Sequence, residues 1–149
     1  MLGIGNLLMG DEGVGVHAVN YIKEENVPLA AHVLDGGTGG FHLLSLFADH
    51  DPIIIIDATM DDKTPGTVTL LEPRFASDFP KTLSAHDIGL RDLVESAAIT
   101  GPLPKLYLIA VSIHDIRSMV TELSPAVQES LPKVVEIARD LLNSENNSA

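Results

Sequence analysis

Cysteine is absent from this chain of 149 residues, and basic residues are few, with 9 Lys and Arg against 21 Asp and Glu. Without cysteine, the chain can form no disulfide, no thiolate metal site and no cysteine nucleophile. The net charge of −12 argues against nucleic acids and anionic membranes, because both need a basic protein face. We therefore expect neither nucleic acid nor a membrane among its partners.

Long apolar runs are also missing. The isoleucine run 53–56 is far shorter than the roughly 20 residues that span a bilayer. The amino-terminal segment has no basic stretch followed by a long apolar one, so we expect no signal peptide and a cytoplasmic location. The length and the apolar content of 45% predict one domain over residues 1–149 with a two-sided core. We expect its polar end, residues 143–149, to be a frayed tail.

Short apolar strands alternate with amphipathic helices along the chain. The patterns predict strands at 1–5, 31–34, 53–56, 66–71 and 106–111, and helices that begin near 11, 41, 84 and 125. The isoleucine run does not alternate with polar residues, which indicates a parallel strand buried on both faces. The strand at 66–71 is weaker and is expected at an edge. The sequence therefore predicts an α/β fold, a three-layer sandwich with a mostly parallel, twisted sheet of about five strands and helices on both faces.

Three polar residues fall where active sites lie in open α/β sheets, outside the carboxyl ends of strands. Glu12 lies in a glycine-rich turn after the first strand, Asp57 follows the isoleucine run, and His86 begins a predicted helix. Two carboxylates and one imidazole leave open positions on Zn, Mn, Ni or Fe. We therefore predict that these three residues form a metal site.

The neighbouring polar residues leave alternatives open. Asp11 could cap the helix that follows it, and the glycines at 10, 13 and 15 indicate that some group closely approaches this backbone. Asp35 precedes a glycine-rich stretch that could be a plain turn with glycine at positive φ. The same stretch could instead bind an extended peptide along the backbone of Gly36, Gly37, Thr38 and Gly39.

Other catalytic motifs do not fit the chain. The dinucleotide fingerprint G-x-G-x-x-G would need a glycine where Leu8 stands, and the acidic pair after it would repel a phosphate. The phosphate-binding motif G-x-x-x-x-G-K-[ST] and the G-x-S-x-G motif of hydrolases are both missing. Nucleotide binding and Ser-His-Asp hydrolysis are therefore poor explanations of the glycine-rich turn.

Four blocks of the sequence resemble, in order, the maturation endopeptidases of [NiFe]-hydrogenases. They are residues 3–15, 35–38, 56–58 and 84–90, and the similarity continues at 123–127. The resemblance implies a single α/β domain that removes a short carboxyl-terminal extension from the hydrogenase large-subunit precursor after nickel insertion. It also implies that bound nickel is the recognition signal and that Glu12, Asp57 and His86 contact it.

On this resemblance, the metal is the nickel of the substrate precursor, and no organic cofactor is expected. The isolated protein is expected to bind a surrogate divalent metal only weakly. Two mechanisms stay open: the metal polarises the scissile carbonyl or activates water, or it serves only for recognition while Asp35 or Asp11 acts as general base. A non-catalytic, metal-sensing chaperone of the same precursor is the alternative function.

Overall fold

A computed structural model of the chain describes residues 1–83 and 89–147, and within them a single sheet has five strands. The strands lie in the order β2-β1-β3-β5-β4; the first four are parallel, and β4 runs antiparallel to β5 at one edge. Both the fold class and the edge position of the strand near 66–71 are confirmed. The strands are β1 (Leu2–Gly3), β2 (Leu34–Asp35), β3 (Ile53–Thr59), β4 (Val68–Leu71) and β5 (Leu106–Ser112).

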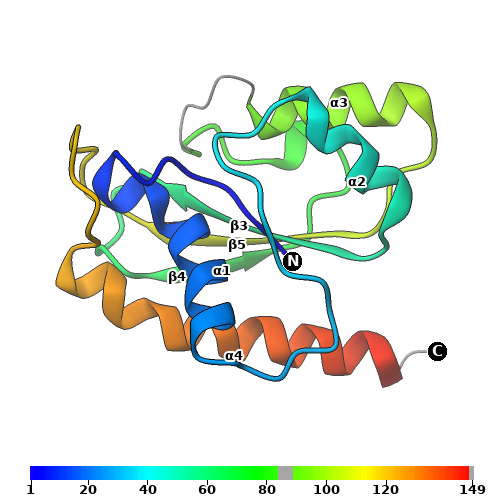
Figure 1. The fold of residues 1–149 in the computed structure, drawn as a ribbon. Coiled ribbons are helices and arrows are strands. Elements are labelled where there is room, and N and C mark those ends of the chain that lie inside the picture. The colour runs from blue at the N-terminus through cyan, green and yellow to red at the C-terminus, as the bar shows by residue number, and fades with distance from the viewer. Residues whose placement is uncertain (84–88, 148–149) are drawn as a thin grey trace.

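Helices cover both faces of the sheet, as predicted. Figure 1 shows α2 and α3 on one face, and α1 and α4 on the other. No helix within the described ranges is both long and apolar enough to cross a membrane. The helices are α1 (Val14–Glu24), α2 (Leu44–Asp49), α3 (Leu90–Thr100) and α4 (Pro125–Asn147), with short 3-10 helices η1 (Gly10–Gly13), η2 (Phe41–Leu43) and η3 (Ala76–Asp78).

The isoleucines of β3 explain how the sheet is held between two cores. Ile53 and Ile55 pack with buried residues of α2 and α3, whereas Ile54 and Ile56 pack with α1 and α4. Each of the four is at most 5% exposed. Because alternate residues of a strand face opposite sides, only a strand apolar on both sides can fill both cores.

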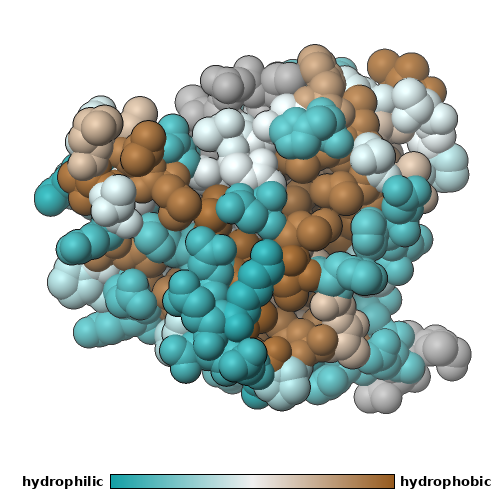
Figure 2. Space-filling model, viewed as in Figure 1, coloured by the Kyte–Doolittle hydropathy of each residue, from teal (hydrophilic) through white to brown (hydrophobic). Residues whose placement is uncertain are grey.

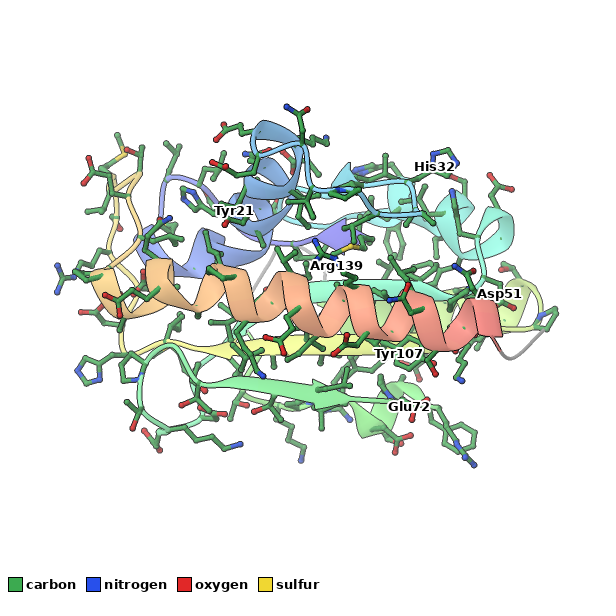
Figure 3. The ribbon with its side chains drawn as sticks, turned by 90° about the horizontal axis from the view of Figure 1, so that it is seen from below. Tyr21, His32, Asp51, Glu72, Tyr107 and Arg139 are labelled. Atoms are coloured by element: carbon green, nitrogen blue, oxygen red, sulfur yellow. The ribbon has the colours of Figure 1, made fainter. Side chains whose placement is uncertain are left out.

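The end of α4 differs from the prediction. The helix continues through Asn147, so the frayed tail expected from residue 143 is wrong for residues 143–147. The Tyr107 hydroxyl on β5 donates a hydrogen bond to the Glu145 carboxylate, and Lys105 Nζ lies 2.9 Å from the same carboxylate. Figure 3 shows Tyr107 close to the carboxyl-terminal part of α4. These contacts with the sheet hold the last turns of a polar helix in place.

Candidate active site

Glycines bring the start of α1 directly onto the backbone of the two central segments, β1 with the residue after it and the middle of β3. A Cβ added to Gly15 would lie 2.2 Å from the carbonyl oxygens of both Ile4 and Ile56, and one added to Gly3 would lie 2.1 Å from the Gly15 oxygen. The group that closely approaches these glycines is therefore the chain's own backbone. This packing fixes η1, which carries the acidic pair, at the carboxyl edge of the sheet.

Glu12 is buried at this edge, with only 3% of the residue exposed. Its Oε2 accepts a hydrogen bond from the backbone N–H of Asn6 at 2.8 Å. The side-chain oxygen of Asn6 in turn accepts the N–H of Leu8 at 2.9 Å. The loop after β1 thus wraps around the Glu12 carboxylate and fixes its orientation.

Asp57 lies near the end of β3 and is fully buried. Its Oδ1 accepts the N–H of Ala58 at 2.8 Å. Alternation along β3 places its side chain on the α2 and α3 face, with Ile53 and Ile55. A buried carboxylate is stable only where hydrogen bonds or positive charge compensate for the lost water. Since η1 packs against β3, two buried carboxylates stand at one edge of the sheet, as predicted.

His86, the third predicted ligand, lies outside the described residues. The chain that leads to it is placed: Leu83 forms an antiparallel bridge with Thr59, and the N–H of Met60 donates to the Thr82 carbonyl at 2.9 Å. Leu83 is thereby fixed beside the strand that carries Asp57. Among the described residues, no group of three or more His, Asp or Glu side chains could hold a metal, so the complete three-residue site stays a prediction.

Asp11 ties η1 to the residue before α4. Its two carboxylate oxygens accept hydrogen bonds from the N–H and the hydroxyl of Ser124, both at 2.7 Å. Neither η1 nor α1 has a capping hydrogen bond from a side chain. The idea that Asp11 caps its own helix is therefore wrong, because the carboxylate is already bonded to a segment more than 100 positions away.

Asp35 lies at the same edge of the sheet but on its other face. Asp35 pairs in register with Gly3, and a Cβ added to Gly3 would point at α1. Paired residues face the same side, so Asp35 lies on the α1 face, whereas Asp57 faces α2 and α3. Asp35 is exposed, and its Oδ1 accepts the N–H of Gly37 at 2.7 Å. Gly37 has a φ of 55° and borders open space on its Cβ side. The stretch is thus a turn, and its binding of a peptide stays a prediction.

Comparison with known proteins identifies the family to which this chain belongs. The family model described as hydrogenase maturation protease matches residues 16–141. This chain belongs to the hydrogenase maturation protease family. It is therefore a peptidase, and the alternative of a chaperone that does not cut its partner is set aside. The match covers the positions of Asp57 and His86 and begins after Glu12.

Relatives and solved structures agree with this assignment. The peptidase is 32% identical over 139 residues to the hydrogenase 2 maturation protease of Escherichia coli (strain K12), a match that covers 91% of this chain and 85% of that protein. The structure of the hydrogenase maturating endopeptidase HybD from E. coli superposes with a TM-score of 0.83 at 32% identity, covering 97% and 91% of the two chains. The [NiFe] hydrogenase maturation protease HybD from Thermococcus kodakarensis gives a TM-score of 0.69 at 27% identity, covering 95% and 96%.

Two buried hydroxyls at this edge escaped the sequence prediction. Thr59 and Ser112, at the ends of β3 and β5, are 2% and 0% exposed and stand opposite each other in register. The Thr59 hydroxyl is 2.7 Å from that of Thr82. The Ser112 hydroxyl has no hydrogen-bond partner within the described structure. The rule that found Asp57, a polar residue closing a buried strand, would also have found them.

Proposed function

We propose that this peptidase removes the carboxyl-terminal extension of a [NiFe]-hydrogenase large-subunit precursor after nickel insertion. In this proposal, Glu12, Asp57 and His86 contact the nickel that the precursor already holds. The observation that supports it most is the burial of Glu12 and Asp57 at the carboxyl edge of one sheet. A cytoplasmic location and the lack of an organic cofactor stay predictions.

The charge of the two carboxylates gives nickel a physical role as a signal. One oxygen of each of Glu12 and Asp57 accepts a backbone N–H, which orients the carboxylate. Carboxylates taken out of water are costly to keep charged, and a divalent cation that contacts both offsets that cost by attracting them. A precursor with nickel therefore gains binding energy here that a precursor without nickel does not.

Hydrolysis itself requires water to attack the scissile carbonyl carbon, while the peptide nitrogen gains a proton and leaves. If a side chain takes the proton from water, the geometry favours Asp35 over Asp11. Asp35 is exposed, with one oxygen bonded to Gly37, whereas both oxygens of Asp11 are bonded to Ser124. The open space beside Gly37 favours an extended tail lying along Gly36, Gly37, Thr38 and Gly39.

The site is tested with three variants: Glu12→Gln, Asp57→Asn and His86→Ala. Each variant should process the nickel-loaded precursor about 100-fold more slowly or worse. Mass spectrometry measures processing as the loss of the extension's mass. The matched control is Glu24→Gln, which removes an exposed acid from the end of α1. Cleavage at the wild-type rate by all three site variants would show that the proposed site is wrong.

The general base is tested separately with Asp35→Asn. If Asp35 takes the proton, this variant should bind the precursor normally and cleave it slowly. Full activity would remove Asp35 from the mechanism and favour water activated at the metal.

A further inference from the structure

Exposed apolar side chains gather around the edge of the sheet that carries Glu12 and Asp57. Four of them come from the loops that follow β1, β3 and β5, and they are between 42% and 79% exposed. We call these four residues the apolar rim: Leu8, Met60, Ile116 and Met119. Figure 2 shows apolar surface at the left of the view, where Figure 1 shows these loops.

The backbone holds two rim residues next to each other. Met9 and Val120 form a parallel bridge, so Leu8 and Met119 are neighbours one residue earlier on each segment. The N–H of Val120 donates to the Leu8 carbonyl at 3.2 Å, and the N–H of Gly10 donates to the Val120 carbonyl at 2.7 Å. Met119 has a φ of 62°, which is uncommon for a residue with a side chain. The fold thus maintains an unfavourable backbone conformation at a methionine that is 79% exposed.

The rim is directly connected to the candidate site. The N–H of Leu8 donates to the Asn6 side chain, whose own backbone N–H donates to Glu12. A surface that covers Leu8 therefore contacts the same hydrogen-bonded loop that orients the Glu12 carboxylate.

Acidic groups flank the rim. Lys63 and Arg117 each lie within 4.0 Å of a neighbouring aspartate, Asp61 and Asp115 respectively. The exposed acids Asp62 and Glu122, on the same two loops, are in no ion pair within the described parts of the chain. A partner surface complementary to the rim would therefore be apolar at its centre and basic at its border.

We propose that the apolar rim is the docking surface for the folded body of the hydrogenase large-subunit precursor, through an apolar patch bordered by basic residues. The inference rests on the proposed function, because the same precursor has to place its nickel at Glu12 and Asp57. A protein that reaches these buried carboxylates covers the loops around them, and apolar side chains gain when another surface excludes water from them.

The test is a double variant, Leu8→Asp with Met119→Asp, acting on the full-length, nickel-loaded precursor. The KM for the precursor should rise by about tenfold, the effect of one strong interface contact, while kcat stays near the wild-type value. The matched control is Ile99→Asp, at the far end of α3, where the isoleucine is 83% exposed. Its KM should not change. Raising the salt concentration should raise the wild-type KM, because the border contacts are ionic.

The outcomes separate the two proposals. If the wild-type protein does not cleave the precursor, the proposed function fails. If it does cleave and the double variant keeps the wild-type KM, the docking inference is overturned while the proposed function stands. Sedimentation of the isolated protein tests a different occupant: a wild-type dimer that the double variant converts to a monomer would assign the rim to a second copy of this chain. If the double variant folds poorly, Met60→Asp provides the test at an independent rim position. It should also raise the KM for the precursor, and an unchanged KM would overturn the docking inference.

Discussion

Gly15→Ala tests how η1 and its acidic pair are held against the sheet. The added methyl group would lie 2.2 Å from the carbonyl oxygens of Ile4 and Ile56, where ordinary contacts begin at 3.4 Å. Both oxygens belong to backbone, Ile4 directly after β1 and Ile56 in the middle of β3, and backbone cannot rotate aside as the end of a side chain can. The start of α1 must therefore move away from the sheet by about 1 Å, which is roughly the difference between the 2.2 Å separation and an ordinary 3.4 Å contact.

Two opposing effects set the magnitude. Replacing glycine by alanine inside a helix stabilises it by about 0.5–1 kcal/mol. Inserting a methyl group into a packed contact costs about 1–3 kcal/mol, and the rigid neighbours of Gly15 favour the upper end of that range. We expect the free energy of unfolding to fall by about 2 kcal/mol, which corresponds to a Tm lower by roughly 4–8 °C for a domain of this size.

Urea unfolding and thermal melting measure the change. The matched control is Gly101→Ala: this glycine follows α3, has an extended φ of 170° and has open space where a Cβ would stand. The control should alter the free energy of unfolding by less than about 0.5 kcal/mol. A Gly15→Ala protein as stable as the wild type, or more stable, would refute the packing argument.

Three further predictions concern stability. Ser112→Ala removes a fully buried hydroxyl without a partner in the described structure, so urea unfolding should show an unchanged or higher free energy of unfolding, and a loss above about 1 kcal/mol would contradict this. Ser124→Ala removes one of two hydrogen bonds to Asp11 and should lower the free energy of unfolding by about 1 kcal/mol, whereas Ser124→Thr should restore it. Burial lowers the pKa of His17, so the imidazole binds a proton more readily in the unfolded chain than in the folded one. The free energy of unfolding is therefore unaffected by this group above about pH 6.5 and falls as the pH drops below that value. Unfolding curves of the wild type and His17→Gln between about pH 8 and 5 check the sign, and an equal pH dependence in both would count against it.

The sequence predicts the sheet well because its signals are local. Four consecutive isoleucines indicate a strand buried on both faces, and β3 has this arrangement. The pair Ser124 and Pro125 predicts a helix start, and α4 begins at Pro125. Each of these patterns depends only on residues next to one another in the chain.

The errors come from contacts between distant segments. Asp11 has the position of a helix cap, but it bonds Ser124, which comes 113 residues later. Glu145 lies in a polar tail that looks frayed, but Tyr107 on β5 holds it, 38 residues away in the chain. A local pattern cannot reveal such a partner, because the partner is chosen by how the elements pack.

The candidate site is intermediate between these two cases. The rule for the ends of parallel strands is sufficient to predict that Glu12 and Asp57 lie at one edge of the sheet. The sheet register is needed to learn that Asp35 faces the opposite side from Asp57. Strand order alone does not give that information, since a shift of one residue would reverse the face.

The most direct test of nickel recognition is the affinity of this peptidase for the precursor with and without nickel, measured for the wild type and for Glu12→Gln. We expect the wild type to bind the nickel-loaded precursor at least about tenfold more tightly than the nickel-free precursor. Glu12→Gln should lose most of this preference while keeping its affinity for the nickel-free form. A Glu12→Gln protein that distinguishes the two precursors as well as the wild type does would contradict the claim that this buried carboxylate contacts the nickel.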